Sequence, residues 1–495
     1  MQLREYQEKA TFEVAVKLAS GRRKVVLQLP TGGGKTVMFS SITKRFIEKQ
    51  TSDVLILVHR RELLNQARKT LWKGFGIPTQ PIIAGMKVVP RSRVYIGMVE
   101  STLKRIPANI GLVIIDEAHI LSFAKIHDYF PSQMIIGVTA TPLTANKKKP
   151  LRNYYDDIVI GTSISQLIKD GSLTQNITYS ISNAIDRKAL KIRNGEFDEG
   201  MMALAFSNKK AIRACVDAYQ RLAPGTKALI FNCSIEHSQL TNQAFVDAGL
   251  PSRHLDGEMK DEDRTAILDW FRNTDGAILN NIGILTAGFD EATVETIIVN
   301  RATMSLPLWL QMCGRGSRIH EIKAFFKIID IGGNAATHND WNFDHDWEVM
   351  FLNPQKPGSG GVAPMRNCDK CEAFIPVRQI ICPICGHEHP KAEIEEMDLQ
   401  MFILATSGID VASLVKANED KKEYYPFFLI GKQLAAMAKK TTPKMSEETF
   451  NFILSQYDIK AKQWCNSKGK QYNAWHKERA KQTLNDELLK FFKAW

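Results

Sequence analysis

The chain has 495 residues, 44% of them hydrophobic, which is enough for about three domains with full-sized cores. No apolar stretch has the length of about 20 residues that spans a membrane, and the charged residues Arg4, Glu5 and Glu8 are unlike a secretory leader. The formal charge of +12, from 65 basic and 53 acidic residues, favours a polyanionic partner. Eight cysteines, four of them scattered singly, do not form a secreted disulfide framework.

The first 160 residues alternate short apolar runs with amphipathic ones, which is typical of a parallel sheet covered by helices. Strands are expected at 24–29, 54–58, 94–98, 113–115 and 134–138, with helices such as 37–48 and 61–73 between them. Ligands of such sheets bind at the carboxyl ends of the strands. We therefore predict a first α/β domain over residues 1–160 with a site at that edge.

A glycine-rich loop follows the first strand, where residues 29–36 read Leu-Pro-Thr-Gly-Gly-Gly-Lys-Thr. The backbone N–H groups of such a loop can wrap phosphate oxygens, because glycine lets the chain approach closely. The loop residues are Thr31, Gly32, Gly33 and Gly34. Lys35 would reach the β- and γ-phosphates of a nucleoside triphosphate, and Thr36 would ligate Mg²⁺. A flexible turn is the alternative, but the order of strand, loop and helix argues against it.

Two adjacent carboxylates, Asp116 and Glu117, follow the apolar strand 113–115 and begin the run Asp-Glu-Ala-His. The strand order of a parallel sheet brings them to the same edge as the glycine loop. Asp116 can hold the magnesium shell while Glu117 orients and deprotonates an attacking water.

A second α/β rhythm begins after residues 164–173, whose end reads as a helix stop followed by a strand. Strands are expected at 228–231, 282–285, 296–299 and 326–329, and helices at 209–222, 235–248 and 261–272. We predict a second domain over residues 161–352, with a hinge near its start.

Two arginines of this second block, Arg315 and Arg318, suit the stabilisation of a γ-phosphate that gains charge during transfer. Because Lys35 and Glu117 belong to the first block, hydrolysis would require the two domains to close. An exposed basic turn is the alternative.

Four cysteines form two tight pairs, Cys368 with Cys371 and Cys382 with Cys385. Two Cys-x-x-Cys turns can set four sulfurs at the corners of a tetrahedron, which indicates a structural Zn²⁺ site. We predict a Pro/Gly-rich linker at 353–365 and a zinc module at 366–392 that folds around its metal. Two unrelated pairs or a redox motif are the alternatives.

The remaining residues, 393–495, are predicted to be a mainly helical domain that becomes basic between 439 and 481. Aromatic residues such as Trp464, Tyr472 and Trp475 are interleaved with the lysines. This pattern is typical of a surface that binds phosphates and stacks on bases. It is equally typical of a small helical domain with an aromatic core.

In order along residues 1 to about 350, these motifs resemble those of the superfamily two helicases and translocases, of the type that carries Asp-Glu-Ala-His. The resemblance implies two RecA-like domains with ATP and Mg²⁺ between them. It implies that Arg4 and Gln7 read the base of ATP and that Gly288 and Asp290 complete the ATP site. It adds Gln311, Arg315 and Arg318 to the catalytic residues Lys35, Asp116 and Glu117.

The same resemblance assigns the residues that link ATP to nucleic acid. Those that couple nucleotide state to grip would be His119, Thr139 and Thr141. Those that touch the phosphate backbone would be His59, Arg60, Ser101 and Thr286.

Within the superfamily, the segments 59–63, 164–168 and 329–338 and the downstream cysteines resemble the bacterial and phage RadD-type repair ATPases and the Res subunits of restriction enzymes. This implies an ATP-dependent DNA helicase or translocase of replication, repair or recombination, in the cytoplasm of a bacterial or phage-infected cell. Its partners would be single-stranded, forked or branched DNA and a single-strand-binding or replication and repair protein. An RNA helicase, an ATP-gated binding switch and a duplex translocase stay open, because the motifs occur in all of them.

Overall fold

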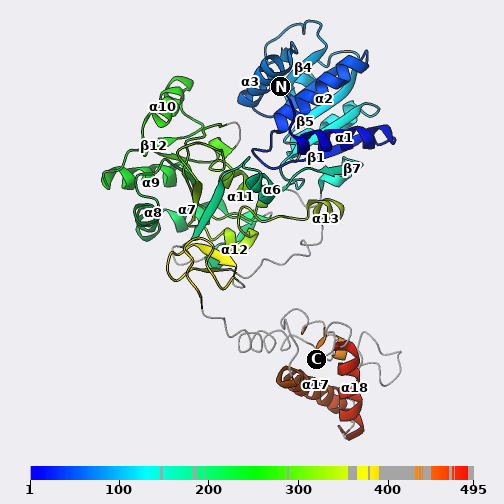
Figure 1. The fold of residues 1–495 in the computed structure, drawn as a ribbon, viewed down its shortest axis with the longest axis vertical. Helices are drawn as coiled ribbons and strands as arrows, with labels where there is room; N and C mark the ends of the chain where they lie inside the picture. Colours follow the sequence, from blue (N-terminus) through cyan, green and yellow to red (C-terminus); the bar gives the residue numbers. More distant parts are fainter. Residues whose placement is uncertain are drawn as a thin grey trace. The chain divides into compact units, whose positions relative to one another are not determined.

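The computed structural model describes residues 2–488. Within this range it leaves out 145–148, 182–184, 186, 194, 287–288, 355–364, 377–378, 390–429, 433, 436–437, 439–446, 468–470 and 473. The chain divides into two compact units, Met1–His387 and Glu388–Trp495 (Figure 1). Most of the predicted linker 353–365 lies outside the described residues, and so does Gly288. Among the described helices, none combines the length and apolar character that crossing a bilayer requires.

The first lobe of the larger unit is a seven-stranded parallel sheet in the order β3-β4-β2-β5-β6-β1-β7, with its covering helices (Figure 1). Its strands are β1 (Lys24–Gln28), β2 (Asp53–Val58), β3 (Gln80–Ile82), β4 (Val94–Met98), β5 (Ile110–Asp116), β6 (Met134–Thr139) and β7 (Asp157–Ile160). Every residue of β2 is buried, as expected for a central strand covered on both faces. The five strands predicted for this block are confirmed, and the short β3 and β7 at the edges are additional.

The helices of the first lobe are α1 (Glu5–Ala19), α2 (Lys35–Lys49), α3 (Arg61–Phe75), α4 (Val99–Leu103) and α5 (Ile126–Tyr129). Both predicted helices, 37–48 and 61–73, are confirmed as α2 and α3. Since α2 and α3 begin directly after β1 and β2, their first turns lie at the carboxyl edge of the sheet.

The second lobe is a six-stranded parallel sheet in the order β12-β13-β11-β14-β15-β8. Its strands are β8 (Gln175–Ser180), β11 (Ala228–Asn232), β12 (Ser252–Leu255), β13 (Ile278–Asn281), β14 (Thr296–Asn300) and β15 (Phe325–Asp330). Its helices are α6 (Ile164–Lys169), α7 (Glu199–Phe206), α8 (Lys209–Leu222), α9 (Ile235–Asp247), α10 (Asp261–Asn273), α11 (Leu306–Cys313) and α12 (Ala335–His338), and a small hairpin pairs β9 (Ile192–Arg193) with β10 (Glu196–Phe197).

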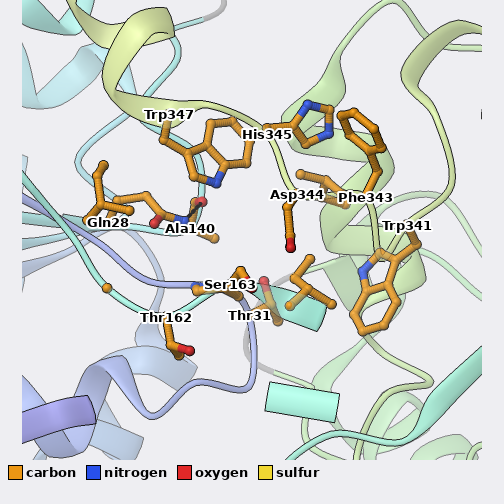
Figure 2. A pocket seen from close by; sticks show the side chains of 15 residues that line it. Gln28, Thr31, Ala140, Thr162, Ser163, Trp341, Phe343, Asp344, His345 and Trp347 are labelled. Atoms are coloured by element: carbon orange, nitrogen blue, oxygen red, sulfur yellow. Dashed lines mark hydrogen bonds between the residues drawn. The ribbon is translucent and has the colours of Figure 1, made fainter. Parts of the chain in front are cut away.

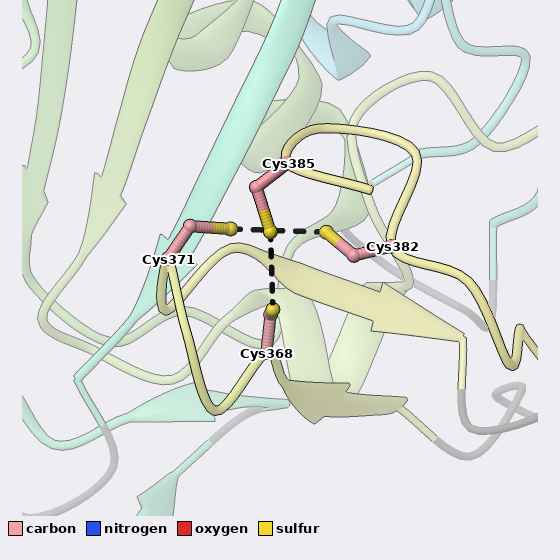
Figure 3. A group of neighbouring side chains, drawn as sticks. All are labelled: Cys368, Cys371, Cys382 and Cys385. Atoms are coloured by element: carbon pink, nitrogen blue, oxygen red, sulfur yellow. Dashed lines mark hydrogen bonds between the residues drawn. The ribbon is translucent and has the colours of Figure 1, made fainter. Parts of the chain in front are cut away.

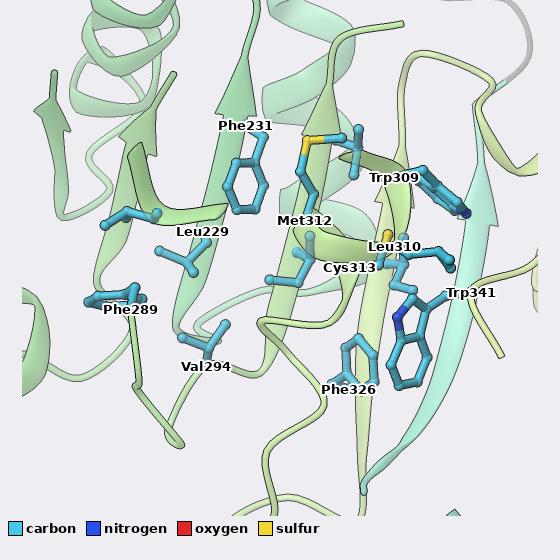
Figure 4. Packing of buried hydrophobic residues seen from close by; sticks show 14 of the residues in the cluster. Leu229, Phe231, Phe289, Val294, Trp309, Leu310, Met312, Cys313, Phe326 and Trp341 are labelled. Atoms are coloured by element: carbon cyan, nitrogen blue, oxygen red, sulfur yellow. The ribbon is translucent and has the colours of Figure 1, made fainter. Parts of the chain in front are cut away.

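Side-chain caps begin several of these helices. Asn208, Ser234 and Ser305 each accept the backbone N–H of the third residue that follows, which satisfies a donor that the helix cannot. One face of the sheet packs on α11, where Trp309 and Met312 meet residues of β11 and β14 (Figure 4). This packing fixes the helix that leads into Arg315.

The strand predicted at 282–285 is wrong. The strand is β13, which ends at Asn281, and residues Ile284–Thr286 form a 3₁₀ turn. Two asparagines made the true strand look like a loop, yet both are fully buried. Asn281 Nδ2 donates to the carbonyl of Ile230 at 2.9 Å and Asn280 Nδ2 donates to Ser252 Oγ at 3.0 Å. Neighbouring strands thus accept a hydrogen bond from each side-chain N–H₂ group, which helps the two asparagines to occupy a core strand.

The chain crosses between the lobes a second time through the segment 339–352, which we call the return segment. It ends in α13 (Trp347–Leu352). Trp347 belongs to the apolar cluster of the second lobe, whereas Phe351 is 1% exposed in the core of the first lobe, under Arg152 at 5.9 Å. Asp344 accepts hydrogen bonds from Ser165 of α6. The return segment is therefore anchored in both lobes and on residues 161–174, the connector that joins β7 to β8 and contains α6.

The cysteine pairs lie around a small antiparallel ladder of β16 (Met365–Asn367) and β17 (Phe374–Pro376). Cys368, Ile375 and Cys382 share the buried cluster that includes residues of β8 and α7. Asn367 Nδ2 also donates to the carbonyl of Ser180 at 3.0 Å. The ladder thus packs against the second lobe and shares its core.

The second unit contains α17 (Glu447–Ser467) and α18 (Ala474–Leu488). They share an apolar cluster that includes Tyr457, Ile453 and Leu484. Tyr472 donates to Asp458 at 2.6 Å within the unit, while the side chains of Trp464 and Trp475 lie outside the described residues. The predicted helical character of this region is confirmed.

Candidate active site

The glycine loop between β1 and α2 has the backbone shape that a phosphate cradle requires. Gly32 and Gly34 have φ values of 87° and 86°, in the left-handed region that favours glycine. A Cβ on Gly34 would overlap the amide of Gln7. The helix α2 begins without a side-chain cap, so its first N–H groups are available to an anion and its positive end faces the loop.

The predicted base-reading segment packs directly on this loop. Gln7 Nε2 and the Tyr6 hydroxyl donate to the carbonyl of Gly33 at 3.1 and 2.9 Å. Arg4 donates from Nη1 to Ser172 Oγ of the second lobe at 2.6 Å. A hollow of about 640 Å³ lies here, lined from both lobes by Arg4, Tyr6, Lys9, Gln166, Asp170 and Ser172 among others. The segment is therefore placed where it could contact a base bound beside the loop.

The carboxylate pair lies at the end of β5, as predicted. Lys35 Nζ is 3.2 Å from Glu117 Oε1, and Asp116 Oδ1 accepts the backbone N–H of Glu117 at 3.0 Å. Glu117 has φ of 54°, which is rare for a residue with a side chain and typical of functional sites. The two carboxylates thus have different partners, a backbone N–H for Asp116 and the Lys35 ammonium for Glu117.

The two carboxyl groups differ in pKa. Burial, reinforced by the charge of Glu117, raises the pKa of Asp116 to about 7. Burial also acts to raise the pKa of Glu117, but Lys35 and His119 outweigh it, so that this pKa is lowered. Glu117 is consequently the carboxylate of the pair that is ionised more readily.

The predicted coupling residues form one chain of contacts with Glu117. His119 Nδ1 lies 3.5 Å from Glu117 Oε2 and 2.9 Å from Thr139 Oγ1. Thr139 Oγ1 in turn donates to the carbonyl of Thr141 at 3.0 Å. Residues from β5 and β6 are thus connected to the carboxylate.

The second lobe brings its arginines to this region. Arg315 is 8% exposed and donates from Nη1 to the carbonyl of Phe289 at 2.7 Å, while Arg318 Nε lies 3.2 Å from Asp290 Oδ1. Burial and the charge of Arg318 lower the pKa of Arg315 to about 10, and the charge of Glu117 opposes them. Gln311 lies partly buried on α11, one turn earlier.

The two lobes are in contact at the glycine loop. A Cβ on Gly32 would lie 2.7 Å from Leu173, and one on Gly314 would lie 3.3 Å from Thr31. Glycine at both positions therefore permits the approach. The same meeting point borders a cavity of about 100 Å³, whose lining includes Thr31, Ser163 of the connector and Trp347 of the return segment (Figure 2).

The residues predicted to touch nucleic acid are only partly brought together. Arg60 donates from Nη1 to the carbonyl of Ile284 across the lobes at 2.8 Å, and Thr286 donates to Gly283 at 2.6 Å nearby. Ser101 is set apart on α4. Arg264 of α10 lies 3.5 Å from Glu62 and lines the same hollow of about 380 Å³ as Arg60. Sequence reasoning missed Arg264, because only the fold brings α10 to this place.

His59 lies apart from that hollow, and burial lowers its pKa to about 4. Its imidazole is within electrostatic reach of Glu117 and His119, so it belongs to the surroundings of the carboxylate pair.

The four paired cysteines converge on one point (Figure 3). The Sγ atoms of Cys368 and Cys385 are 3.7 Å apart, as are those of Cys371 and Cys382. Four Zn–S bonds of about 2.3 Å in a tetrahedron place the sulfurs about 3.8 Å from one another. The cluster therefore fits Zn²⁺, and four protein ligands would leave no position for a substrate.

Family models match both lobes. Residues 1–144 match the family described as type III restriction enzyme, res subunit, and residues 209–320 match the helicase conserved C-terminal domain. The two matches contain the glycine loop, the carboxylate pair and the two arginines.

Individual relatives agree with these families. A 51.5 kDa protein of Lactococcus phage (isolate 7-9) is 29% identical over 90% of this chain and 100% of its own length. IRC3 of Saccharomyces cerevisiae (strain ATCC 204508 / S288c), a proposed ATP-dependent helicase, is 30% identical over 68% of this chain, which spans only 52% of that protein. The DNA-bound structure of LlaBIII, an ATP-dependent type ISP restriction-modification enzyme, has a similar fold, with a TM-score of 0.54. The two sequences are 16% identical, and the match covers 99% of this chain and 42% of the LlaBIII chain. The two lobes thus match helicase-family domains of superfamily two, and the chain is related to restriction-enzyme subunits and to IRC3.

Proposed function

We propose that this protein is a DNA-stimulated ATPase that uses ATP to unwind or remodel duplex or branched DNA in replication, repair or recombination. The observation that carries the proposal is the meeting of the two lobes at the glycine loop. Lys35 and the carboxylates approach from one side and Arg315 approaches from the other. Such a site is complete only when the lobes are together, so each cycle of ATP binding and hydrolysis can move them.

The roles of the side chains follow from their positions. Lys35 and Thr36 would bind phosphate and Mg²⁺, and Asp116 would hold the metal, which supplies charge neutralisation on the phosphates. Glu117 would take the proton of the attacking water, and Arg315 with Arg318 would stabilise the charge that develops.

The remaining roles are proposed on the same basis. The base would meet Arg4 and Gln7, with Gly288 and Asp290 completing the site from the second lobe. Coupling would run through His119, Thr139 and Thr141, and phosphates of the strand would meet Arg60, Ser101 and Thr286.

The ion pair of Lys35 and Glu117 supports a specific first step. Lys35 carries one positive charge, so a bound γ-phosphate, which has more negative charge than a carboxylate, would compete with Glu117 for its ammonium. Bound ATP would therefore draw Lys35 away and leave Glu117 free for water. Hydrolysis would restore the pair and loosen the contact of the lobes.

DNA is the substrate that we favour. The matched res-subunit family and the DNA-bound LlaBIII support it, and so does the likeness to RadD-type proteins of the Asp-Glu-Ala-His class. A structural Zn²⁺ on the four cysteines, a cytoplasmic location in a bacterial or phage-infected cell, and a single-strand-binding or repair protein as partner complete the proposal.

The proposal is tested with the purified full-length chain on matched DNA and RNA forks at stated salt, since salt weakens phosphate contacts. We expect DNA to stimulate ATP hydrolysis and the DNA fork to be separated, and Lys35→Ala to abolish both. Equal activity of Lys35→Ala would contradict the assigned site. Stimulation by RNA alone would assign the protein to RNA, and hydrolysis without strand separation would indicate a switch or a duplex translocase, which a triplex-displacement assay separates.

A further inference from the structure

The end of β2 lies beside the end of β5, which carries the proposed general base. The two strands are parallel neighbours in which Leu57 pairs with Ile115. Two residues beyond each member of this pair come His59 and Glu117. The imidazole and the carboxylate are close enough for each to shift the pKa of the other. The fold therefore places them side by side at the carboxyl edge of the sheet.

Both side chains carry a buried atom that lacks a hydrogen-bond partner among the described residues. These atoms are Nδ1 of His59 and Oε2 of Glu117. An unpaired buried polar atom costs free energy, so each is a candidate for a partner in another state of the site. The ring of His119 comes within 3.5 Å of Oε2, which is too long for a hydrogen bond, and burial lowers the pKa of this imidazole.

The other partners of Glu117 are already committed. Lys35 holds Oε1 at 3.2 Å, but a bound γ-phosphate would take that ammonium. Nδ1 of His119 contacts Thr139 Oγ1 at 2.9 Å. His59 is therefore the neighbour whose ring nitrogen is free to hold the carboxylate once Lys35 has left it.

The residue after His59 connects this point to the nucleic-acid face. Arg60 reaches across the lobes to the carbonyl of Ile284 and lines the hollow that it shares with Arg264. A phosphate is a stronger acceptor for a guanidinium than a neutral carbonyl is. A nucleic-acid strand entering the hollow would thus compete with the carbonyl of Ile284 for the Arg60 guanidinium. Because His59 is the preceding residue, a shift of Arg60 would also move His59.

We propose that His59 is a positioning residue for Glu117, which hydrogen-bonds Oε2 when a nucleic-acid strand engages Arg60 and so aims the other carboxylate oxygen at the attacking water. The inference rests on the proposed function and gives it a second route of regulation, separate from the contacts of His119 with Thr139. His59 would therefore act on the proposed general base, Glu117, and would not contact the nucleic-acid strand.

The test compares three variants by ATP hydrolysis at saturating forked DNA. His59→Leu removes both ring nitrogens, and His59→Asn keeps a hydrogen-bonding nitrogen near the place of Nδ1. His127→Leu is the matched control, because His127 is a buried imidazole of the same lobe on α5, stacked among Tyr154 and Tyr155. Melting temperature and ATP affinity are measured on each preparation, and His59→Ala is the second variant if His59→Leu does not fold.

We expect His59→Leu to lower the DNA-stimulated kcat by about tenfold or more, as loss of one hydrogen bond to a charged group does, with KM for ATP and Kd for DNA changed by less than about twofold. His59→Asn should recover most of the loss, and His127→Leu should keep the wild-type kcat. A normal kcat in His59→Leu would overturn the inference, as would a rise in Kd for DNA with normal kcat at saturation. Absence of stimulation in the wild type would instead remove the proposed function itself.

Discussion

Replacing Glu117 by glutamine separates the chemistry of the site from its affinity for nucleotide. The side chain is 14% exposed and its Oε1 lies 3.2 Å from Lys35 Nζ, so the substitution keeps the shape and removes the charge. A positioned general base contributes about 10²–10⁴-fold to rate. We therefore expect kcat to fall by about that factor, which corresponds to about 3–5 kcal/mol in the activation barrier.

The affinity for ATP should move in the other direction. The charge of Glu117 is one of the causes that raise the pKa of Asp116 to about 7, so its removal lowers that pKa and leaves Asp116 more fully ionised for Mg²⁺. Lys35 also loses its partner and becomes free for phosphate. Kd for ATP in Glu117→Gln should consequently be equal to or below that of the wild type.

The assay is steady-state ATP hydrolysis at saturating forked DNA, combined with equilibrium binding of a fluorescent ATP analogue. Glu100→Gln, at an exposed position of α4, is the matched control and should keep both constants. Wild-type kcat in Glu117→Gln, or a raised KM with unchanged kcat, would refute the assignment of Glu117 as the base.

Three further predictions concern the metal, the return segment and pH. Cys382→Ser should release the zinc measured per chain and lower the melting temperature, because Cys382 is 1% exposed in the core of the second lobe; Cys215→Ala should retain the zinc, and full zinc in Cys382→Ser would contradict the site. Phe351→Ala should lower the free energy of unfolding by about 3–5 kcal/mol in urea denaturation, since its ring is 1% exposed. Leu352→Ala, at 42% exposure, should change that free energy little. Equal effects of the two variants would show that Phe351 does not anchor the return segment in the first lobe. Burial lowers the pKa of His127 from 6.5 to about 4, so the unfolded chain binds the proton more readily than the folded one. The free energy of unfolding should therefore fall by about 3 kcal/mol as pH drops from 6.5 to 4. His127→Phe should flatten this part of the profile of stability against pH, and an unchanged slope would show that His127 is not its source.

The placement of groups that lie close together in the sequence was predictable. The glycine loop, the carboxylate pair and the paired cysteines each combine residue type with short spacing, and short spacing fixes which groups can face one ligand. The apolar run 54–58 of β2 was equally clear, because a strand buried on both faces needs continuous hydrophobic residues. The same rhythm indicated two α/β lobes before any contact between them was known.

Contacts that depend on strand order and on the meeting of the lobes required the tertiary structure. The strand β13 escaped prediction because its buried asparagines donate hydrogen bonds to partners far away in sequence. Phe351 belongs to the core of the first lobe although it follows the second, and Arg264 reaches the hollow that it shares with Arg60 only through the packing of α10. His59 stands beside Glu117 because β2 and β5 are neighbours, and strand order is set by long-range burial, which no local pattern of residues encodes.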